Sequence, residues 1–354
     1  MILPRAPLGG ARCAPDIPGK ALVLTAGLGT RLRPLTYVRA KAAVPVNGET
    51  LARRACRWLV DHGIRDLVLN LHHFPATVTG SVGDGSDLGA RVRYSWEDPV
   101  LGSGGGPRRA LPLLVDPSGI SWRESPVTSR QPSAANRETF LIVNGDTLTD
   151  VDTAAMAALH AESGAAVTMA LIPNPRPDKY GGVRVADGRW VTGFTRAGAG
   201  ETSYHFIGVQ IAEARVFADL EDGVPFETVN ALYPQLIARD GHSVAAFISN
   251  ASFRDIGTPA DYLATSAQLA ASEGDKMASG KRTRIDASAS VLRSAVWDDV
   301  KIGAGADIIE CILCDGVEIP AGAQYRRCAI VPAGGRSPKA DERIDGGLLI
   351  REID

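Results

Sequence analysis

The sequence Leu24-Thr25-Ala26-Gly27-Leu28-Gly29-Thr30-Arg31-Leu32-Arg33-Pro34-Leu35-Thr36 is the strongest indication of the fold class of this chain. It continues an apolar run that begins at Ala21. The pattern predicts a buried strand that runs into a glycine loop. Gly27 and Gly29 let the backbone approach a ligand closely because neither has a Cβ. Amide groups exposed in such a turn bind phosphate oxygens, and Arg31 adds a cationic fork. The first hypothesis is chemistry on a nucleotide, and the alternative is a glycine turn with solvated arginines.

Two common phosphate-binding loops do not fit this stretch. A dinucleotide fingerprint requires a third glycine where the chain has Leu32, and a P-loop requires a Gly-Lys-Ser/Thr end that this string lacks. The whole string instead resembles the signature loop of the sugar-1-phosphate nucleotidylyltransferases, also called NDP-sugar pyrophosphorylases. The resemblance implies a catalytic role for Arg31, and nucleotide contacts from Leu24, Ala26, Gly27, Gly29 and Thr30.

Length and composition place the chain among globular proteins. Its 354 residues predict one large α/β domain and a smaller one. With 38 Lys+Arg against 40 Asp+Glu, the net charge of −2 does not favour a nucleic-acid or membrane surface. The first twenty residues carry no apolar signal segment, so we expect a cytoplasmic protein with reduced cysteines. A zinc site at Cys311 and Cys314 would need further ligands nearby, and only Cys328 follows.

Apolar strands alternate with helical stretches from Ala21 to about Asp255, which predicts a Rossmann-like mixed sheet with helices on both faces. Helices are expected over Glu49–His62 and Arg108–Leu114, and a small antiparallel sheet over the site from Tyr180 to Val209. The Pro- and Ser-rich residues 115–139 predict a mobile insertion, or alternatively a substrate lid. The strand candidates are Ala21–Leu24, Leu67–Leu71, Val92–Trp96, Phe140–Val143, Val167–Ile172 and Val244–Ile248.

A different period begins after Lys281, where apolar residues recur about every six positions, as in a short left-handed parallel β-helix of two to three coils. A short antiparallel sheet is the alternative. The recurring residues are Ile285, Val291, Val296, Ile302, Ile308, Ile312 or Leu313, and Ile319. The expected domains are a flexible N-terminus (1–19), a catalytic domain (20–275), the β-helix (281–332) and a tail (333–354).

Two further segments match the family resemblance around the nucleotide. Lys41 corresponds to the lysine of the family's Pro-Lys-Pro element, although alanines replace both prolines here. The resemblance implies that Lys41 is catalytic and neutralises triphosphate charge, and the alternative is a solvated lysine. The segment Leu101–Arg109 resembles the glycine-rich segment that packs against the nucleobase. It implies nucleotide contacts from Gly102, Gly104 and Gly105, ahead of the next helix.

Two aspartates follow predicted strands. Asp146 ends the sequence Asn144-Gly145-Asp146 after the strand Phe140–Val143, and Asp255 lies in Phe253–Pro259. Ligands of open α/β sheets bind at the carboxyl ends of strands. By resemblance, both residues are metal ligands and Asp146 is also catalytic; Mg²⁺ requires only one or two carboxylates when phosphates and water complete its shell. Helix capping by each aspartate is the alternative.

The sugar-phosphate region departs from the family pattern. Where the family has Glu-Lys-Pro, this chain has Thr195-Arg196-Ala197. Arg196 can hold a phosphate in place of the lysine, and Glu201 can replace the missing glutamate. The resemblance also implies contacts from Gly182 and His205, although His205 is equally compatible with an ordinary strand position.

The implied reaction is NTP + sugar-1-phosphate → NDP-sugar + pyrophosphate, an activity of class EC 2.7.7. The guanylyltransferases of mannose- or heptose-1-phosphate are favoured, with uridylyl transfer to a sugar such as N-acetylmuramate-1-phosphate as the alternative. A non-catalytic regulatory subunit would be expected to lose an aspartate, Arg31 or Lys41, and all are present. A hexapeptide acyltransferase needs a histidine in its coils, but the last histidine is His242. The β-helix predicts a homo-oligomer.

Overall fold

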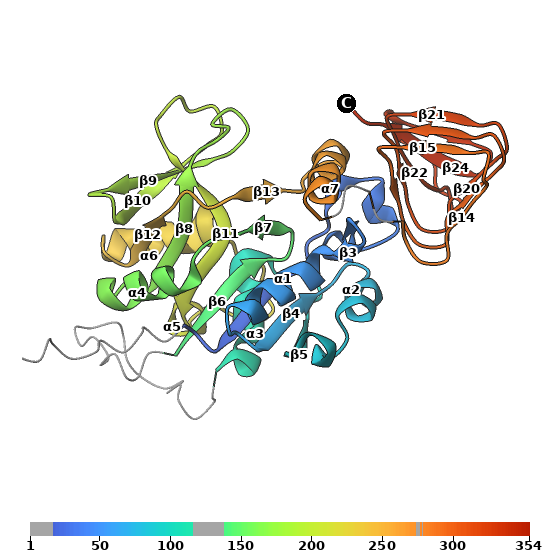
Figure 1. Ribbon diagram of the computed structural model, residues 1–354. Coiled ribbons are helices and arrows are strands. Elements are labelled where there is room, and N and C mark those ends of the chain that lie inside the picture. Colours follow the sequence, from blue (N-terminus) through green and yellow to red (C-terminus); the bar gives the residue numbers. More distant parts are fainter. Residues whose placement is uncertain (1–16, 116–137, 274–276, 278) are drawn as a thin grey trace, which may run out of the picture.

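A nine-stranded mixed sheet forms the centre of the computed structural model, which describes residues 17–115, 138–273, 277 and 279–354. β1, β4, β5 and β6 run parallel, whereas β11 is antiparallel to both of its main neighbours, β6 and β8. Figure 1 shows this sheet beside a separate stack of C-terminal strands. The strand order is β5 (Arg91–Trp96), β4 (Asp66–Leu71), β1 (Lys20–Leu24), β6 (Thr139–Asn144), β11 (Tyr204–Glu213), β8 (Val167–Pro173), β12 (Val244–Ile248), β10 (Trp190–Thr195) and β9 (Gly182–Ala186).

Helices cover both faces of the sheet, as the strand and helix alternation predicted. α1 (Leu51–Asp61), α2 (Pro75–Val82) and α4 (Thr153–Ser163) pack on one face. The other face carries α3 (Gly102–Leu114), α5 (Arg215–Ala218) and α6 (Tyr233–Arg239). All six strands expected from apolar runs are confirmed within one residue at each end. Within the described ranges, none of the helices is long and apolar enough to cross a membrane.

Short elements connect the strands near their carboxyl ends. The loop after β1 folds into three single-turn helices, η1 (Thr30–Leu32), η2 (Leu35–Tyr37) and η3 (Lys41–Ala43). Two small antiparallel sheets of two strands each pair β2 (Pro45–Val46) with β3 (Glu49–Thr50), and β7 (Thr147–Thr149) with β13 (Phe253–Asp255). The remaining elements of this part are η4 (Ser86–Leu88), η6 (Thr228–Leu232) and α7 (Pro259–Glu273).

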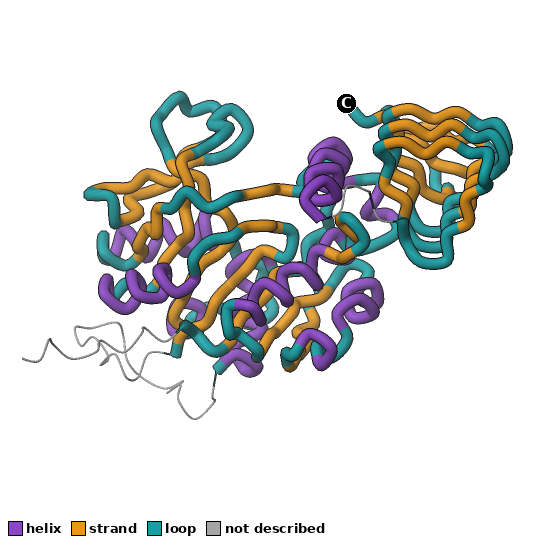
Figure 2. The backbone as a smooth tube through the Cα atoms, in the orientation of Figure 1, coloured by secondary structure: helices purple, strands orange, loops and turns teal. Residues whose placement is uncertain are grey.

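The C-terminal strands repeat at a step of 17 residues and pair in parallel. Figure 2 shows them as turns stacked at one end of the molecule, an arrangement compatible with a β-helix. Three such sheets form, β14 (Arg284–Ile285) with β17 (Lys301–Ile302) and β20 (Glu318–Ile319), β15 (Ser290–Leu292) with β18 (Asp307–Ile309) and β21 (Gln324–Arg326), and β16 (Ala295–Val296) with β19 (Ile312–Leu313) and β22 (Cys328–Pro332). The chain ends in a hairpin that extends the last sheet, β23 (Glu342–Asp345) and β24 (Leu348–Glu352).

Two boundaries around the glycine-rich segment differ from the sequence prediction. The helix expected to begin at Arg108 begins at Gly102, so the glycines predicted to form a loop lie in its first turns. Tertiary packing overrides their low helix propensity, because the amides of Gly104 and Gly105 both donate to the carbonyl of Phe226, at 2.8 and 3.2 Å. α1 begins at Leu51 rather than at Glu49, since the two preceding residues pair in β3.

The prediction of a separate antiparallel sheet over Tyr180–Val209 is wrong. β9, β10 and β11 are antiparallel to one another where they pair, but they belong to the central sheet. β11 is buried along most of its length and lies between β6 and β8, which fixes the hairpin of β9 and β10 to the same sheet. The insertion predicted at 115–139 lies outside the described residues except for its ends, and so do residues 1–16.

One apolar cluster joins the C-terminal strands to the glycine-loop region. Leu32 and Leu35 from that loop pack in the same cluster as Ile312 and Leu349 from the C-terminal strands. Trp297 lies within it, only 1% exposed, and its Nε1 donates to the hydroxyl of Tyr262 in α7 at 2.8 Å. The two parts of the chain therefore share a core.

We predict that Trp297→Ala destabilises the protein by about 3–5 kcal/mol, because it opens a large cavity in this shared core. The matched control is Trp96→Ala, since that side chain is 54% exposed. Urea unfolding followed by circular dichroism measures both. Equal unfolding midpoints for the two variants would contradict the shared core.

Candidate active site

A cavity of about 310 Å³ opens at the carboxyl ends of β1, β4 and β6. Of the residues predicted to contact nucleotide, Leu24, Ala26, Gly27 and Gly102 line it. Of the three predicted catalytic residues, Lys41 and Asp146 line it and Arg31 does not. The rest of the lining comes from Thr25, Ala42, Asn70, Glu97, Val100, Ser103, Asn144, Gly145 and Glu227. The strand ends therefore gather residues that are far apart in the sequence.

Asn70 and Glu97 hold the glycine loop in place through buried hydrogen bonds. The Oδ1 atom of Asn70 accepts the amide of Thr25 at 2.5 Å and that of Ala26 at 3.3 Å. Its Nδ2 atom donates to Glu97 at 2.7 Å, and the other oxygen of Glu97 accepts the amide of Leu101 at 2.8 Å. Both side chains are buried, so this pair fixes the glycine loop relative to the start of α3. Sequence reasoning missed them, although each is a polar residue at the carboxyl end of a predicted strand.

Gly29 shapes the loop rather than lining the cavity. Its φ is +59°, and a Cβ there would lie 2.8 Å from Thr36 Cγ2 and 2.9 Å from Lys41 Cβ. The turn therefore requires glycine and brings Lys41 against the loop. Thr30 also lies outside the cavity lining, and it is exposed.

Gly104 and Gly105 lie inside α3, against the segment 224–227. Both amides are already bonded to Phe226, and a Cβ at Gly105 would lie 2.6 Å from the carbonyl oxygen of Val224. The structure thus gives these two glycines a packing role and does not bring them into the cavity lining, whereas Gly102 does reach it.

The predicted catalytic residues meet at the end of β6. The ammonium of Lys41 donates to the carboxylate of Asp146 in an ion pair. Gly145 lets the ends of β1 and β6 approach closely, because a Cβ there would lie 2.8 Å from the carbonyl oxygen of Leu24. The β7–β13 pairing sets Asp255 opposite Thr147, and so beside Asp146 despite their separation in sequence.

Opposing charges surround Asp255. Burial raises the pKa of its carboxyl above the ordinary value, and the carboxylates of Asp146 and Asp261 raise it further, whereas Lys41 and Arg31 lower it. Arg31 reaches this point from the loop, with its Nη1 against Gly257. No hydrogen bond or ion pair with another described residue engages the Asp255 carboxylate.

The residues present fit the metal that the family resemblance implies. The described part of the chain holds no group of three or more His, Cys, Asp or Glu side chains able to hold a metal. Mg²⁺ does not require one, since one or two carboxylates suffice when phosphates and water supply the other ligands. Asp146 lines the cavity, and Asp255 lies beside Asp146 without lining it, so these two carboxylates are the candidate ligands.

Aromatic rings gather in the predicted sugar-phosphate region. His205 lies 4.4 Å from the ring of Tyr180 and 4.8 Å from that of Phe253, between ring centroids. The pKa of His205 lies below its ordinary value, because the effect of burial outweighs that of a hydrogen bond with the backbone of Gly181, which raises the pKa. Gly182 packs against Ser203 in the same region.

Lys179 is a cation that sequence reasoning missed. Its Nζ lies 3.2 Å from both carboxylate oxygens of Asp261, the residue that also acts on Asp255. Arg196 and Glu201 are exposed in the connection between β10 and β11 and do not line the cavity. The structure therefore does not bring these two residues together with Lys41 and Asp146.

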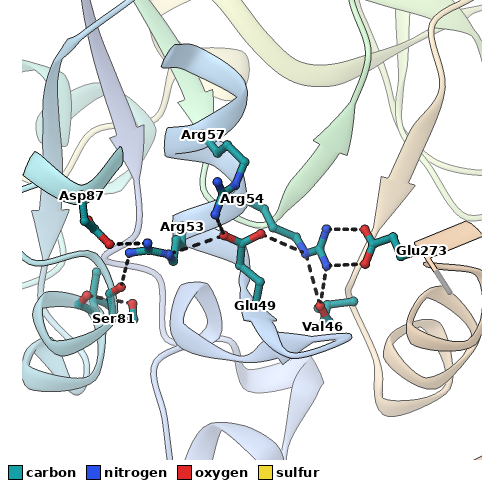
Figure 3. A network of polar contacts seen from close by, with 9 residues as sticks. Val46, Glu49, Arg53, Arg54, Arg57, Ser81, Asp87 and Glu273 are labelled. Carbon is teal, nitrogen blue, oxygen red and sulfur yellow. Dashed lines mark hydrogen bonds and ion pairs between the residues drawn. The ribbon is translucent and has the colours of Figure 1, made fainter. Parts of the chain in front are cut away.

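A larger cavity of about 1240 Å³ lies between α1 and the C-terminal strands. Figure 3 shows Arg53, Arg54 and Arg57 of α1 reaching toward neighbouring carboxylates. Arg57 donates to Glu49 at 2.5 Å, and Arg54 to Glu273 at 2.8 Å. The smaller cavity beside the glycine loop is the better candidate for a phosphate ligand, because it opens at the carboxyl ends of the strands, where open α/β sheets bind ligands.

The fold and this cavity define an α/β protein of the class that binds ligands where its strands end. Residues 20–272 match the family model described as Nucleotidyl transferase, and the chain belongs to that family. This confirms the resemblance inferred from the sequence.

Individual relatives carry names of sugar-1-phosphate nucleotidylyltransferases. Mannose-1-phosphate guanylyltransferase of Mycobacterium tuberculosis is 27% identical over 70% of this chain and 64% of its own length, so the chain spans less than two thirds of that relative. D-glycero-alpha-D-manno-heptose 1-phosphate guanylyltransferase of Aneurinibacillus thermoaerophilus is 28% identical over 69% of this chain and 95% of its own. N-acetylmuramate alpha-1-phosphate uridylyltransferase of Neisseria meningitidis is 33% identical over 58% and 79%.

Crystal structures support the same fold. HddC from Yersinia pseudotuberculosis superimposes with a TM-score of 0.57 at 21% identity, over 71% of this chain and 99% of that one. The same protein has also been crystallised with GMP-PN, and that structure gives a TM-score of 0.55. At this identity the similarity establishes the fold of the nucleotidyl transferase part.

We predict that Gly106→Ala destabilises the protein by about 1–3 kcal/mol through overpacking. A Cβ there would lie 2.7 Å from Glu97 Oε1 and 3.0 Å from Asn70 Nδ2, the pair that supports the glycine loop. The control, Gly80→Ala in α2, meets no atom within 4 Å. It should stabilise by about 0.5–1 kcal/mol, as alanine does in a helix. Urea unfolding compares the two, and stabilisation by both would contradict the packing argument.

Proposed function

We propose that this protein transfers a nucleotidyl group, in the first place guanylyl from GTP, to a sugar-1-phosphate. The observation that carries the proposal is the meeting of Lys41, Asp146, Asp255 and Arg31 beside a cavity lined by the glycine loop. Two cations and two carboxylates at one strand edge match the needs of a triphosphate and its metal. Family membership supports the same class of reaction.

The chemistry requires positioning more than acid–base catalysis. An oxygen of the sugar phosphate attacks the α-phosphorus of the triphosphate, and the bond from that phosphorus to the bridging oxygen breaks, releasing pyrophosphate. The attacking oxygen is already anionic at neutral pH, so no side chain has to remove a proton. Alignment and positive charge supply the rate enhancement. In this proposal Arg31 and Lys41 stabilise the charge that develops on the phosphates.

Asp146 and Asp255 are the proposed Mg²⁺ ligands. The bound ion would neutralise charge on the α-phosphate and the leaving pyrophosphate. Asp146 forms an ion pair with Lys41, whereas Asp255 makes no such bond within the described residues. Lys41 would then exchange its carboxylate partner for phosphate oxygens when metal and triphosphate arrive together.

Guanylyl transfer is favoured over uridylyl transfer by the names of relatives. Mannose- and heptose-1-phosphate guanylyltransferases match about 70% of the chain. Relatives named uridylyltransferases also match: that of N-acetylmuramate alpha-1-phosphate is 33% identical over 58% of the chain, and that of glucose-1-phosphate is 25% identical over 80%. Transfer of a uridylyl group is therefore the second candidate. A non-catalytic regulatory subunit is the third, and the intact Lys41–Asp146 pair argues against it.

The remaining proposals concern the architecture around the site. The C-terminal strands form a left-handed β-helix in our proposal, supported by the constant 17-residue step of their parallel pairing. A homo-oligomer through these strands is supported by apolar residues that they expose, Ile285, Leu292 and Ile344. We propose that the catalytic domain ends at residue 275 and that the β-helix begins at residue 281. We also propose that the enzyme is cytoplasmic, because nucleoside triphosphates are available in that compartment.

The direct test is pyrophosphate release with Mg²⁺ across five nucleoside triphosphates and a panel of sugar-1-phosphates. We expect turnover in one combination, with GTP and mannose- or heptose-1-phosphate. Asp146→Ala and Asp255→Ala should each lower kcat by about a hundredfold or more, since each removes a charge that stabilises the transition state.

The matched control is Asp187→Ala, a carboxylate in the turn between β9 and β10. It should leave kcat unchanged. Nucleotide binding without turnover in any combination would favour the regulatory subunit, and a protein that binds none of the five nucleotides would refute the proposal.

Arg196 provides a test of the sugar-phosphate site. If its guanidinium holds the sugar phosphate, Arg196→Ala should raise the KM for the sugar-1-phosphate by about tenfold and leave that for the nucleotide unchanged. Arg189→Ala is the control, because that arginine pairs with Glu162 at 3.0 Å. An unchanged KM for the sugar-1-phosphate would contradict this role of Arg196 and make Lys179 the next candidate to bind the sugar phosphate.

A further inference from the structure

The segment from Arg31 to Lys41 carries both proposed catalytic cations but has little regular structure of its own. It consists of three single-turn helices and forms no part of a strand ladder. Single helical turns are weak elements in isolation. The position of the cations therefore depends on what the intervening residues contact.

Arg39 is held by the C-terminal strands. Its Nε and Nη2 donate to the two carboxylate oxygens of Asp315, at 2.5 and 2.7 Å, and Nη2 also donates to Asp298 at 2.7 Å. The guanidinium lies 5.5 Å from the ring centroid of Trp297. Burial alone would lower the pKa of Arg39, but the hydrogen bonds and charges of the two aspartates raise it above its ordinary value.

The pair of aspartates is a product of the 17-residue repeat. Ala295 and Val296 pair in parallel with Ile312 and Leu313, so Asp298 and Asp315 follow at equivalent places on neighbouring turns. The amide of Asp298 donates to the Asp315 carboxylate at 3.1 Å. Two carboxylates so close repel each other unless a cation lies between them, and Arg39 supplies that cation.

Three further hydrogen bonds hold the middle of the segment. The hydroxyl of Tyr37 donates to Glu342 at 3.1 Å, and Arg336 donates to the Tyr37 carbonyl at 3.0 Å. The Arg33 carbonyl accepts a hydrogen bond from Arg351 at 2.7 Å. Residues 33–39 are thus fixed from three sides by residues of the C-terminal strands and the connection between them.

One buried residue separates Arg39 from Lys41. Ala40 is fully buried, and its amide donates to Thr77 Oγ1 at 3.1 Å, so the chain cannot absorb a shift of Arg39 at this point without disturbing its packing. Directly after Ala40, Lys41 begins η3 and pairs with Asp146. A displacement of Arg39 should therefore reach the Lys41 ammonium.

We propose that Arg39 is a positioning residue, and that Asp298 and Asp315 act through it to hold Lys41 in place for the triphosphate. The C-terminal strands then contribute to nucleotide binding although none of their residues lines the cavity. This inference rests on the proposed function for the role of Lys41. It assigns to the repeat a task in the site in addition to any role in assembly.

The test measures the equilibrium affinity for the nucleoside triphosphate that binds most tightly in the presence of Mg²⁺, together with KM and kcat for turnover. The double variant Asp298→Asn/Asp315→Asn should weaken nucleotide affinity by about tenfold and raise the nucleotide KM, because a misplaced cation loses its phosphate contact. The KM for the sugar-1-phosphate should change by less than about twofold. Arg39→Lys keeps the charge without the fork and should fall between the wild type and Arg39→Ala.

Glu318→Gln is the matched control. Glu318 pairs with Lys301 at 2.6 Å, also 17 residues apart on the repeat, but both side chains are largely exposed. It should leave nucleotide affinity unchanged. Partial unfolding of a variant would lower the active fraction without changing the nucleotide KM. The single variant Asp298→Asn keeps both hydrogen bonds from Arg39 to Asp315 and should have a smaller effect than the double variant.

The outcomes separate the two proposals. Wild-type nucleotide affinity in the double variant would overturn the positioning role and leave the proposed function intact. A wild type that binds nucleotide but turns over no sugar phosphate would overturn the proposed function, while a weakened affinity in the double variant would still support the positioning role. A wild type that binds no nucleotide would overturn both.

Discussion

The ion pair between Lys41 and Asp146 is the interaction on which the candidate site depends. It joins the loop after β1 to the end of β6, and both partners are largely shielded from water. A shielded pair is costly to break by removing one partner, because the other charge is left without compensation. In the proposed function, a triphosphate and a divalent cation would supply a new partner to each side chain. The pair thereby fixes the position of Lys41 relative to the end of β6.

Glycines in this protein serve packing as much as ligand approach. Gly145 permits contact between the ends of β1 and β6, Gly29 permits contact between the loop and Lys41, and Gly105 permits contact between α3 and residue 224. Each of these would bring a Cβ closer than 3.0 Å to a neighbour. The site is therefore rich in glycine because its elements pack closely against one another. Only Gly27, which has no atom within 4 Å of a hypothetical Cβ, lines the cavity without such a constraint.

The sequence predicted what depends on local pattern and missed what depends on tertiary contacts. Apolar runs located six strands because burial imposes them locally. The start of α3 was missed because a carbonyl from residue 226, more than a hundred positions away, satisfies its first amides. Asn70, Glu97 and Lys179 were missed for the same reason, since their roles come from partners distant in the chain. Lys41 and Asp146 were found only through the motif resemblance, and spacing alone would not have paired them.

The repeat explains why the two parts of the chain need each other. A parallel stack places equivalent residues of successive turns side by side, so an acidic residue repeated at the 17-residue step builds up like charge. The exposed faces avoid this by alternating sign, as in Lys301 with Glu318 and Arg282 with Asp299. Asp298 and Asp315 break the rule, and within the described residues Arg39 is the only arginine that forms an ion pair with them. Isolated from the nucleotidyl transferase part, the C-terminal strands would retain this pair of carboxylates without the ion pair to Arg39, with only the charge of Arg282 nearby, and Trp297 would lose its hydrogen bond to Tyr262. Docking of the two parts is thus favoured both by the shared apolar core and by charge.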